Sequence, residues 1–130
     1  MAKKKVLVVD DEVDLVEILK KRLETNGCDV VTANNGRTAL EMVKSEKPDA
    51  VLLDVMMPEV DGLTVLKEIR AKDANLPVFI ITAFSNEERI KIAGKLNVSG
   101  YIVKTQDLAA EIKNIVSIID IAGKFKDKRG

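Results

Sequence analysis

The sequence predicts an α/β domain in which helices cover both faces of a doubly wound, five-stranded parallel sheet. Short apolar runs alternate with longer segments whose apolar residues recur every three or four positions, as expected of strand–helix units. The first and third apolar runs are almost uninterrupted, which is typical of central strands buried on both faces. Right-handed crossovers restrict the topology, and the strand order 2-1-3-4-5 is the common solution.

The predicted strands are short runs of mainly apolar residues bounded by polar or turn-forming residues. They are Lys5–Val9, Cys28–Ala33, Ala50–Leu53, Pro77–Ile81 and Gly100–Val103. Cys28 is the only cysteine, and we expect it to be a buried strand residue and not a redox sensor. Because no internal disulfide bond can form, the sequence fits a reducing, cytoplasmic location.

The predicted helices are the segments with helical apolar spacing that follow each strand. They span Glu12–Asn26, Arg37–Glu46, Gly62–Ala71, about Ser85–Leu96 and about Leu108–Ile119. Gly27 ends the first helix, because glycine readily adopts the left-handed conformation found after many helices. The residues Ser85-Asn-Glu-Glu88 form a capping-box pattern that opens the fourth helix.

Composition and charge exclude several classes of function. The 130 residues suit one domain, which we place at residues 1–123, followed by a basic tail at residues 124–130. Lys and Arg number 21 and so do Asp and Glu, and aromatic residues make up 3%, so neither nucleic acid nor a membrane is an expected partner. The chain contains no histidine and therefore cannot supply a phosphohistidine or an imidazole ligand.

Polar side chains stand at the carboxyl ends of four predicted strands. Asp10 and Asp11 follow the first strand, Asp54 ends the third, Thr82 follows the fourth and Lys104 follows the fifth. In doubly wound sheets the ligand site lies beyond this edge, near the first and third strands. The sequence therefore predicts that these side chains converge there.

Three converging carboxylates repel one another, by on the order of 4 kcal/mol for each pair at ~4 Å and an effective dielectric constant near 20. Either they keep protons or a cation binds, and a hard divalent ion such as Mg²⁺ suits oxygen ligands. Mg²⁺ commonly shares its ligand shell with a phosphoryl group, and a carboxylate can act as nucleophile and form an aspartyl phosphate. A lysine and a hydroxyl group could then hold the phosphoryl oxygens.

Five segments of the sequence closely resemble the receiver domain of two-component response regulators, a flavodoxin-like fold. They are VLVVDDE at 6–12, ANNGRTAL at 33–40, PDAVLLDVMMPEVDG at 48–62, PVFIITA at 77–83 and GYIVK at 100–104. Receivers are themselves known examples of the 2-1-3-4-5 strand order, so that part of the fold prediction is not independent of the resemblance.

The resemblance implies a phosphorylation site with a bound Mg²⁺ ion. Asp54 would be the phosphoacceptor. Asp11 would be a direct Mg²⁺ ligand, with Asp10 close by and acting through water, and the backbone carbonyl of Met56 would complete the protein's share of the ligands. The phosphoryl donor would be a phosphohistidine on a sensor histidine kinase or a histidine phosphotransfer protein.

The resemblance also implies a conformational switch. Thr82 would donate a hydrogen bond to the phosphoryl group and Lys104 would pair with it, while Tyr101 occupies the position of the family's switch aromatic. The face formed by the fourth helix, fifth strand and fifth helix would then change shape. Because no DNA-binding segment follows in these 130 residues, we expect a stand-alone, chemotaxis-regulator-like domain whose output is contact with another protein.

Two departures from the family pattern carry predictions. Thr105 follows Lys104 where the family usually has a proline with a cis peptide bond. A cis bond before a non-proline residue costs ~2.5–4 kcal/mol, so we expect a trans bond or a strained loop. Met56 and Phe84, two residues beyond Asp54 and Thr82, are apolar, and we expect them to shield the phosphoryl group from water and slow its hydrolysis.

Other interpretations of the same residues stay open. Asp10 and Asp11 could cap the first helix, and Tyr101 could be an ordinary core residue. The chain could be a Mg²⁺-dependent phosphatase of the haloacid-dehalogenase type, which also uses an aspartate nucleophile. That class needs a second acid two residues after the nucleophile. Asp54 does not meet this requirement, because Met56 stands there, whereas Asp10 does, because Glu12 stands there. It could also be a receiver-like interaction module that is never phosphorylated.

Overall fold

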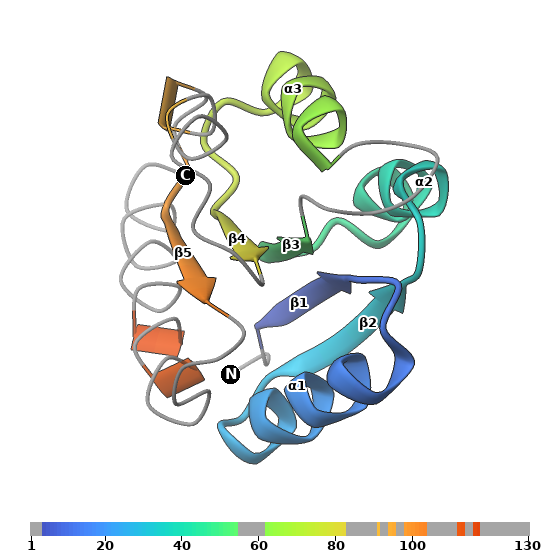
Figure 1. The fold of residues 1–130 in the computed structure, drawn as a ribbon, viewed down its shortest axis with the longest axis vertical. Coiled ribbons are helices and arrows are strands. Elements are labelled where there is room, and N and C mark those ends of the chain that lie inside the picture. Colours follow the sequence, from blue (N-terminus) through green and yellow to red (C-terminus); the bar gives the residue numbers. More distant parts are fainter. Residues whose placement is uncertain are drawn as a thin grey trace.

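Five parallel strands form one sheet in the order β2-β1-β3-β4-β5 in the computed structural model of the chain (Figure 1). The strands are β1 (Lys5–Val9), β2 (Asp29–Ala33), β3 (Ala50–Asp54), β4 (Val78–Thr82) and β5 (Gly100–Val103). The structure describes residues 4–54, 62–82, 91, 94–95, 98–103, 112–113 and 116–117. The predicted strand order is confirmed.

Helices cover both faces of the sheet, as predicted. Helix α1 (Val13–Thr25) lies on one face, whereas α2 (Gly36–Glu46) and α3 (Gly62–Lys72) lie side by side on the other (Figure 1). Residues 91, 94–95, 112–113 and 116–117 are also helical and fall within the fourth and fifth predicted helices. Ile112 packs in the same buried cluster as α1.

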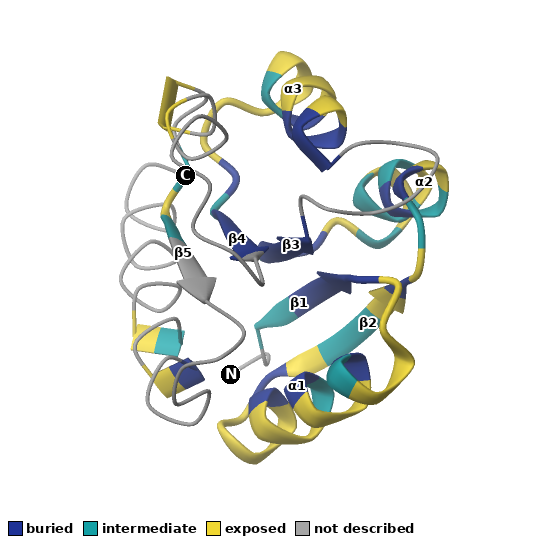
Figure 2. Cartoon of the chain, viewed as in Figure 1, coloured by how far each residue is buried: buried dark blue, intermediate teal, exposed yellow. Residues whose placement is uncertain are grey.

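The central strands β1 and β3 supply side chains to two separate cores. Leu7 and Leu53 join the cluster under α2 and α3, whereas Val8 and Leu52 join the cluster under α1. This alternation follows from the two-residue period of a strand. All five residues of β3 are buried, which explains why its sequence is an unbroken apolar run before the aspartate (Figure 2).

The element boundaries differ from the predicted ones by a residue or two. Helix α1 ends as expected, with Gly27 in the left-handed region at φ 88°. Cys28 lies just before β2 and is 4% exposed, so its predicted burial is confirmed. Lys47, the C-cap residue of α2, is also left-handed at φ 47°, a feature that the sequence did not indicate. The predicted capping box at residues 85–88 lies outside the described residues.

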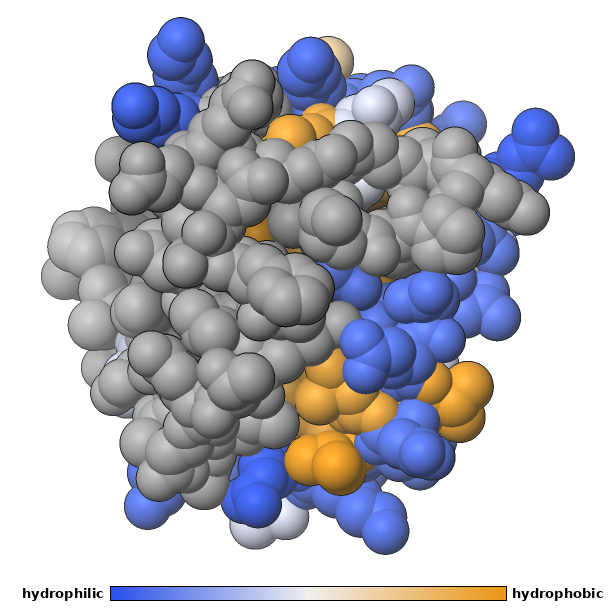
Figure 3. All heavy atoms as spheres, in the orientation of Figure 1, coloured by the Kyte–Doolittle hydropathy of each residue, from blue (hydrophilic) through white to orange (hydrophobic). Residues whose placement is uncertain are grey.

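The surface in Figure 3 is mainly hydrophilic where its residues are described, with apolar atoms exposed around α1. Val13 and Ile18, both on α1, are the large apolar residues found exposed among the described residues. Within the same part of the chain, no helix combines the length and the apolar character needed to span a bilayer.

Candidate functional site

The register of the sheet places the predicted site residues at its carboxyl edge. Val9, the last residue of β1, pairs with Leu53 of β3, so the next residue of each strand, Asp10 and Asp54, stands at the same level. Asp54 pairs with Ile81 on its other side, one residue before the end of β4. The two central strands therefore deliver their carboxylates side by side.

The three aspartates form one cluster, as the sequence predicts. Asp10, Asp11 and Asp54 each offer a carboxylate oxygen, and these oxygen atoms lie within 4.8 Å of one another. Asp10 is 1% exposed and Asp54 is 2% exposed, whereas Asp11 is exposed to solvent. Two buried carboxylates and one solvent-facing carboxylate thus share a small volume, where like charges repel strongly.

Two of the described hydrogen bonds hold Asp10 in place. Its backbone N–H donates to the carbonyl oxygen of Ala33, at the end of β2, over 3.2 Å. Its Oδ1 accepts a hydrogen bond of 3.0 Å from the backbone N–H of Glu12. The sequence did not indicate this role for Glu12. An aspartate two residues before an expected helix start could have suggested it, because aspartate side chains often bond the backbone two residues on.

Helix capping does not account for the aspartate pair. The N-cap residue of α1 is Glu12, and its side chain makes no capping hydrogen bond. A capping side chain accepts from the second or third helical N–H, whereas the described bond of Asp10 goes to the N-cap residue itself. Burial of Asp10 beside Asp54 is therefore better explained by the cluster than by α1.

The donor set fits a small, hard cation. Mg²⁺ prefers carboxylate and water oxygens at about 2.1 Å, which puts neighbouring ligand atoms about 3 to 4 Å apart. Oxygen atoms within 4.8 Å of one another need only small side-chain adjustments to reach that arrangement. A cation there would also offset the repulsion among the carboxylates. Asp10, Asp11 and Asp54 are thus the described residues that could hold Mg²⁺.

A hollow of about 330 Å³ opens beside the cluster. It is lined by Asp10 and by residues of α1, the end of β2 and the start of α2, among them Val13, Glu17 and Thr38. Asn35 fixes the start of α2 there, because its side chain accepts a hydrogen bond of 2.8 Å from the Thr38 N–H. The hollow therefore borders Asp10 and residues of both α1 and α2, although Asp10 itself is only 1% exposed.

The remaining predicted site residues are described only in part. Thr82 is the last residue of β4 and pairs with Val103, and Tyr101 lies in β5 opposite Ile80. These pairings place Thr82 at the same edge as the cluster, but the described structure of Thr82 and Tyr101 is limited to the backbone. The predictions for Met56, Phe84, Lys104 and Thr105 fall outside the described residues.

Comparison with known proteins gives relatives among bacterial regulators. The alkaline phosphatase synthesis transcriptional regulatory protein PhoP of Bacillus subtilis (strain 168) is 40% identical over 130 residues, covering 97% of this chain and 54% of that protein. The regulatory protein AtoC of Escherichia coli (strain K12) is 38% identical over 104 residues, covering 80% of this chain and 23% of that protein. The chain spans about half the length, or less, of these curated relatives.

Solved structures show the same fold. The signal receiver domain of a putative LuxO repressor protein from Vibrio parahaemolyticus matches with a TM-score of 0.91 at 23% identity and covers 99% of both chains. The response regulator protein TrrA from Thermotoga maritima, solved in complex with Mg²⁺-BeF, matches with a TM-score of 0.80 at 36% identity. It covers 89% of this chain and 98% of that one.

The family model described as the response regulator receiver domain matches residues 6–116, which include every predicted site residue. This match covers most of the chain and agrees with the strand order, the acid cluster and the 40% identical relative. The chain therefore belongs to the response regulator receiver domain family of two-component systems, whose members are signalling phosphoacceptors.

Proposed function

We propose that this receiver accepts a phosphoryl group on Asp54 from a phosphohistidine, with Mg²⁺ held by Asp10, Asp11 and Asp54. The observation that carries the proposal is the cluster of three carboxylate oxygen atoms within 4.8 Å at the carboxyl edge of the sheet. The relative TrrA, solved in complex with Mg²⁺-BeF, supports the choice of cation. The donor would be a sensor histidine kinase or a histidine phosphotransfer protein.

In the proposed reaction a carboxylate oxygen of Asp54 attacks phosphorus as the bond from phosphorus to the donor imidazole nitrogen breaks. The imidazole leaves with the electron pair, and Asp54 becomes an acyl phosphate. Mg²⁺, when bound, would neutralise negative charge on the phosphoryl oxygens. The chain's own contribution is positioning: the end of β3 presents Asp54, and the end of β1 holds Asp10 beside it.

Three further residues complete the proposal. Thr82, at the end of β4, would donate a hydrogen bond to the phosphoryl group, and Lys104, directly after β5, would pair with its charge. The backbone carbonyl of Met56 would add a Mg²⁺ ligand. The support for these roles is the match of residues 6–116 to the receiver family and the place of each residue in the sequence, at the end of a described strand or within two residues after it.

The proposed output is a change in the face that contains β5, read by another protein. Thr82 would move toward the phosphoryl group and Tyr101 would turn inward, so a local charge change would favour one of two conformations. The relatives PhoP and AtoC are regulatory proteins longer than this chain. The name of PhoP describes regulation of transcription by a protein about twice as long, and for this chain we propose protein–protein contact as the output.

The test is a titration with beryllofluoride, a mimic of the bound phosphoryl group, in the presence and absence of Mg²⁺. Two-dimensional NMR should show Mg²⁺-dependent shifts around residues 54, 82 and 101 in the parent and none in Asp54→Asn. A parent spectrum that does not respond would contradict the proposal and favour an unphosphorylated interaction module. Repeated turnover of a simple phosphate ester would favour the phosphatase alternative.

A further inference from the structure

Asp10 is held at two points by described neighbours. Its backbone N–H donates to Ala33 O at 3.2 Å, and its Oδ1 accepts from the Glu12 N–H at 3.0 Å. The first bond ties the end of β1 to the end of β2. The second fixes the orientation of the carboxylate itself, because a side-chain rotation would break it. Asp11, the next residue, is exposed to solvent.

The Glu12 amide is placed for this contact by the start of α1. Glu12 is the N-cap residue, with extended backbone angles of φ −88° and ψ 101°. Its carbonyl oxygen accepts the first described bond of the helix, from Val16 N–H at 3.0 Å, so its N–H faces away from the helix and toward the loop after β1. The amide lies at the positive end of the α1 dipole, which favours a carboxylate partner.

Such a bond matters to a magnesium site in particular. Mg²⁺ demands near-ideal octahedral geometry and loses its water reluctantly, so a carboxylate already held in one orientation binds the ion, directly or through one of its waters, at lower entropic cost. Groups that hydrogen-bond to metal-ligating side chains orient them, and their loss weakens metal affinity by about 10- to 100-fold. In the described structure the Glu12 amide stands in that relation to Asp10.

We propose that Glu12 is a positioning residue for the cation site and acts through its backbone N–H, not through its side chain. This inference rests on the proposed function, because it requires that the three aspartates bind Mg²⁺. It assigns no ligand role to Glu12. Proline is the residue that lacks a backbone N–H, so the inference predicts that Glu12→Pro weakens Mg²⁺ binding. Other substitutions at this position should preserve Mg²⁺ affinity.

The experiment is calorimetric titration of Mg²⁺ into four proteins: the parent, Glu12→Pro, Glu12→Ala and Val13→Pro. Glu12→Pro removes the amide, and the φ of −88° at Glu12 needs to change by only about 20° to reach the angle that proline requires. Glu12→Ala loses the same side chain and charge but keeps the amide. Val13→Pro adds a proline at the first helical position, where proline is tolerated, and leaves the Glu12 amide intact.

We expect Glu12→Pro to bind Mg²⁺ about 10-fold more weakly than Glu12→Ala. Val13→Pro should bind within about 2-fold of the parent, since proline suits that position. Equal affinity of Glu12→Pro and Glu12→Ala would overturn the inference while leaving the proposed function intact. Absence of Mg²⁺ binding by the parent would instead overturn the proposed function, and the inference with it.

If Glu12→Pro does not fold, hydrogen exchange of the Glu12 amide in the parent protein tests the inference. Hydrogen exchange of the Glu12 amide should be slow without Mg²⁺, because the N–H is bonded to a buried carboxylate. It should become slower still when Mg²⁺ binds and fixes Asp10. An amide that exchanges at the rate of an open loop, or that does not respond to Mg²⁺, would overturn the positioning role.

Discussion

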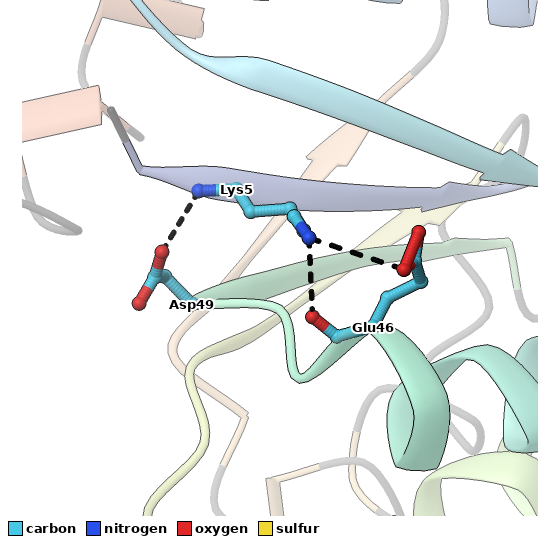
Figure 4. Close-up of polar contacts among 3 residues, drawn as sticks. All are labelled: Lys5, Glu46 and Asp49. Atoms are coloured by element: carbon cyan, nitrogen blue, oxygen red, sulfur yellow. Dashed lines mark hydrogen bonds and ion pairs between the residues drawn. The ribbon is translucent and has the colours of Figure 1, made fainter. Parts of the chain in front are cut away.

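Strand β3 starts next to Asp49 and ends with Asp54, and these two carboxylates lie in contrasting surroundings. Asp49 is half-buried, and its Oδ2 accepts a hydrogen bond of 2.8 Å from the Lys5 backbone N–H (Figure 4). The Lys5 Nζ lies 3.9 Å from Glu46 Oε2 and donates to the Glu46 carbonyl oxygen over 3.4 Å. Asp54 is instead buried in a cluster with two other aspartates.

A second group of polar contacts lies at the same edge of the sheet as Asp49, in the connection between α3 and β4. Arg70 donates to the carbonyl oxygens of Leu76 and Asp73 over 2.7 Å and 3.2 Å. The carboxylate of Asp73 in turn accepts from the N–H groups of Asn75 and Leu76 over 2.9 Å and 3.1 Å. At the amino edge of the sheet, charged side chains therefore stabilise the connections between elements by hydrogen bonding to backbone groups.

The contrast indicates that the charged residues of the amino edge stabilise the fold, whereas those of the carboxyl edge serve ligand binding. Charges at the amino edge meet opposite charges or backbone groups, so each is expected to stabilise the fold. Acids gathered at the carboxyl edge repel one another until a cation binds. Such local conflicts are expected at functional sites, where stability is sacrificed for ligand binding. Removing a charge that has a described partner at the amino edge should therefore lower the free energy of unfolding, whereas removing one from the acid cluster should raise it when Mg²⁺ is absent.

The largest expected effect is at the carboxyl edge. Asp54→Asn should raise the free energy of unfolding without Mg²⁺ by about 2 kcal/mol, because it removes the repulsion between Asp54 and two other carboxylates. This value is below the ~4 kcal/mol for a close pair because solvent screens the exposed Asp11. Urea unfolding in the presence of a chelator measures this. Added Mg²⁺ should stabilise the parent more than the variant, since it binds the intact cluster more tightly. If Asp54→Asn were less stable than the parent in the presence of chelator, repulsion among the aspartates would not be what distinguishes the carboxyl edge from the amino edge.

The next effect is a loss at the amino edge. Arg70→Ala should lower the free energy of unfolding by about 1.5 kcal/mol, because two carbonyl oxygens lose their guanidinium donor. Burial lowers the pKa of Arg70 and the nearby Asp73 opposes that shift, so part of the stabilisation offsets desolvation. Urea unfolding measures the loss, and Arg70→Lys should recover only part of it. The beryllofluoride response should persist in both variants. Its loss would mean that the contacts of Arg70 also affect the geometry of the acid cluster.

Asp49→Asn, one residue before β3 begins, is the matched counterpart of Asp54→Asn at the other end of that strand. The amide oxygen can still accept a hydrogen bond from the Lys5 N–H, but the bond is no longer charge-assisted. The free energy of unfolding should fall by about 1 kcal/mol, the difference between charged and neutral acceptors. Chemical unfolding of both variants under one set of conditions gives the comparison. Stabilisation by Asp49→Asn would show that the two ends of β3 do not differ in the way proposed.

The sequence predicted the sheet and the acid cluster well because short-range patterns indicate each strand, and the strand order is the one known for the receivers that the sequence resembles. Uninterrupted apolar runs in β1 and β3 fix those strands as central, and their register then brings Asp10 level with Asp54. The Glu12 amide and the left-handed Lys47 were not predicted, because backbone angles and hydrogen bonds at loop residues depend on how the flanking elements pack. Side-chain patterns carry little information about such positions.

Lys47 leads to the smallest prediction, and it again concerns the amino edge. This exposed residue, the C-cap of α2, has φ 47° and ψ 59°, a conformation that costs a residue with a Cβ atom roughly 1 kcal/mol. Lys47→Gly should raise the free energy of unfolding by about 0.5 kcal/mol, after the greater flexibility of glycine in the unfolded chain is subtracted. Lys47→Ala keeps the Cβ atom and should leave stability nearly unchanged. An equal gain in both variants would assign the effect to the lysine charge instead of the backbone, and the amino edge would then contain an unfavourable charge of its own.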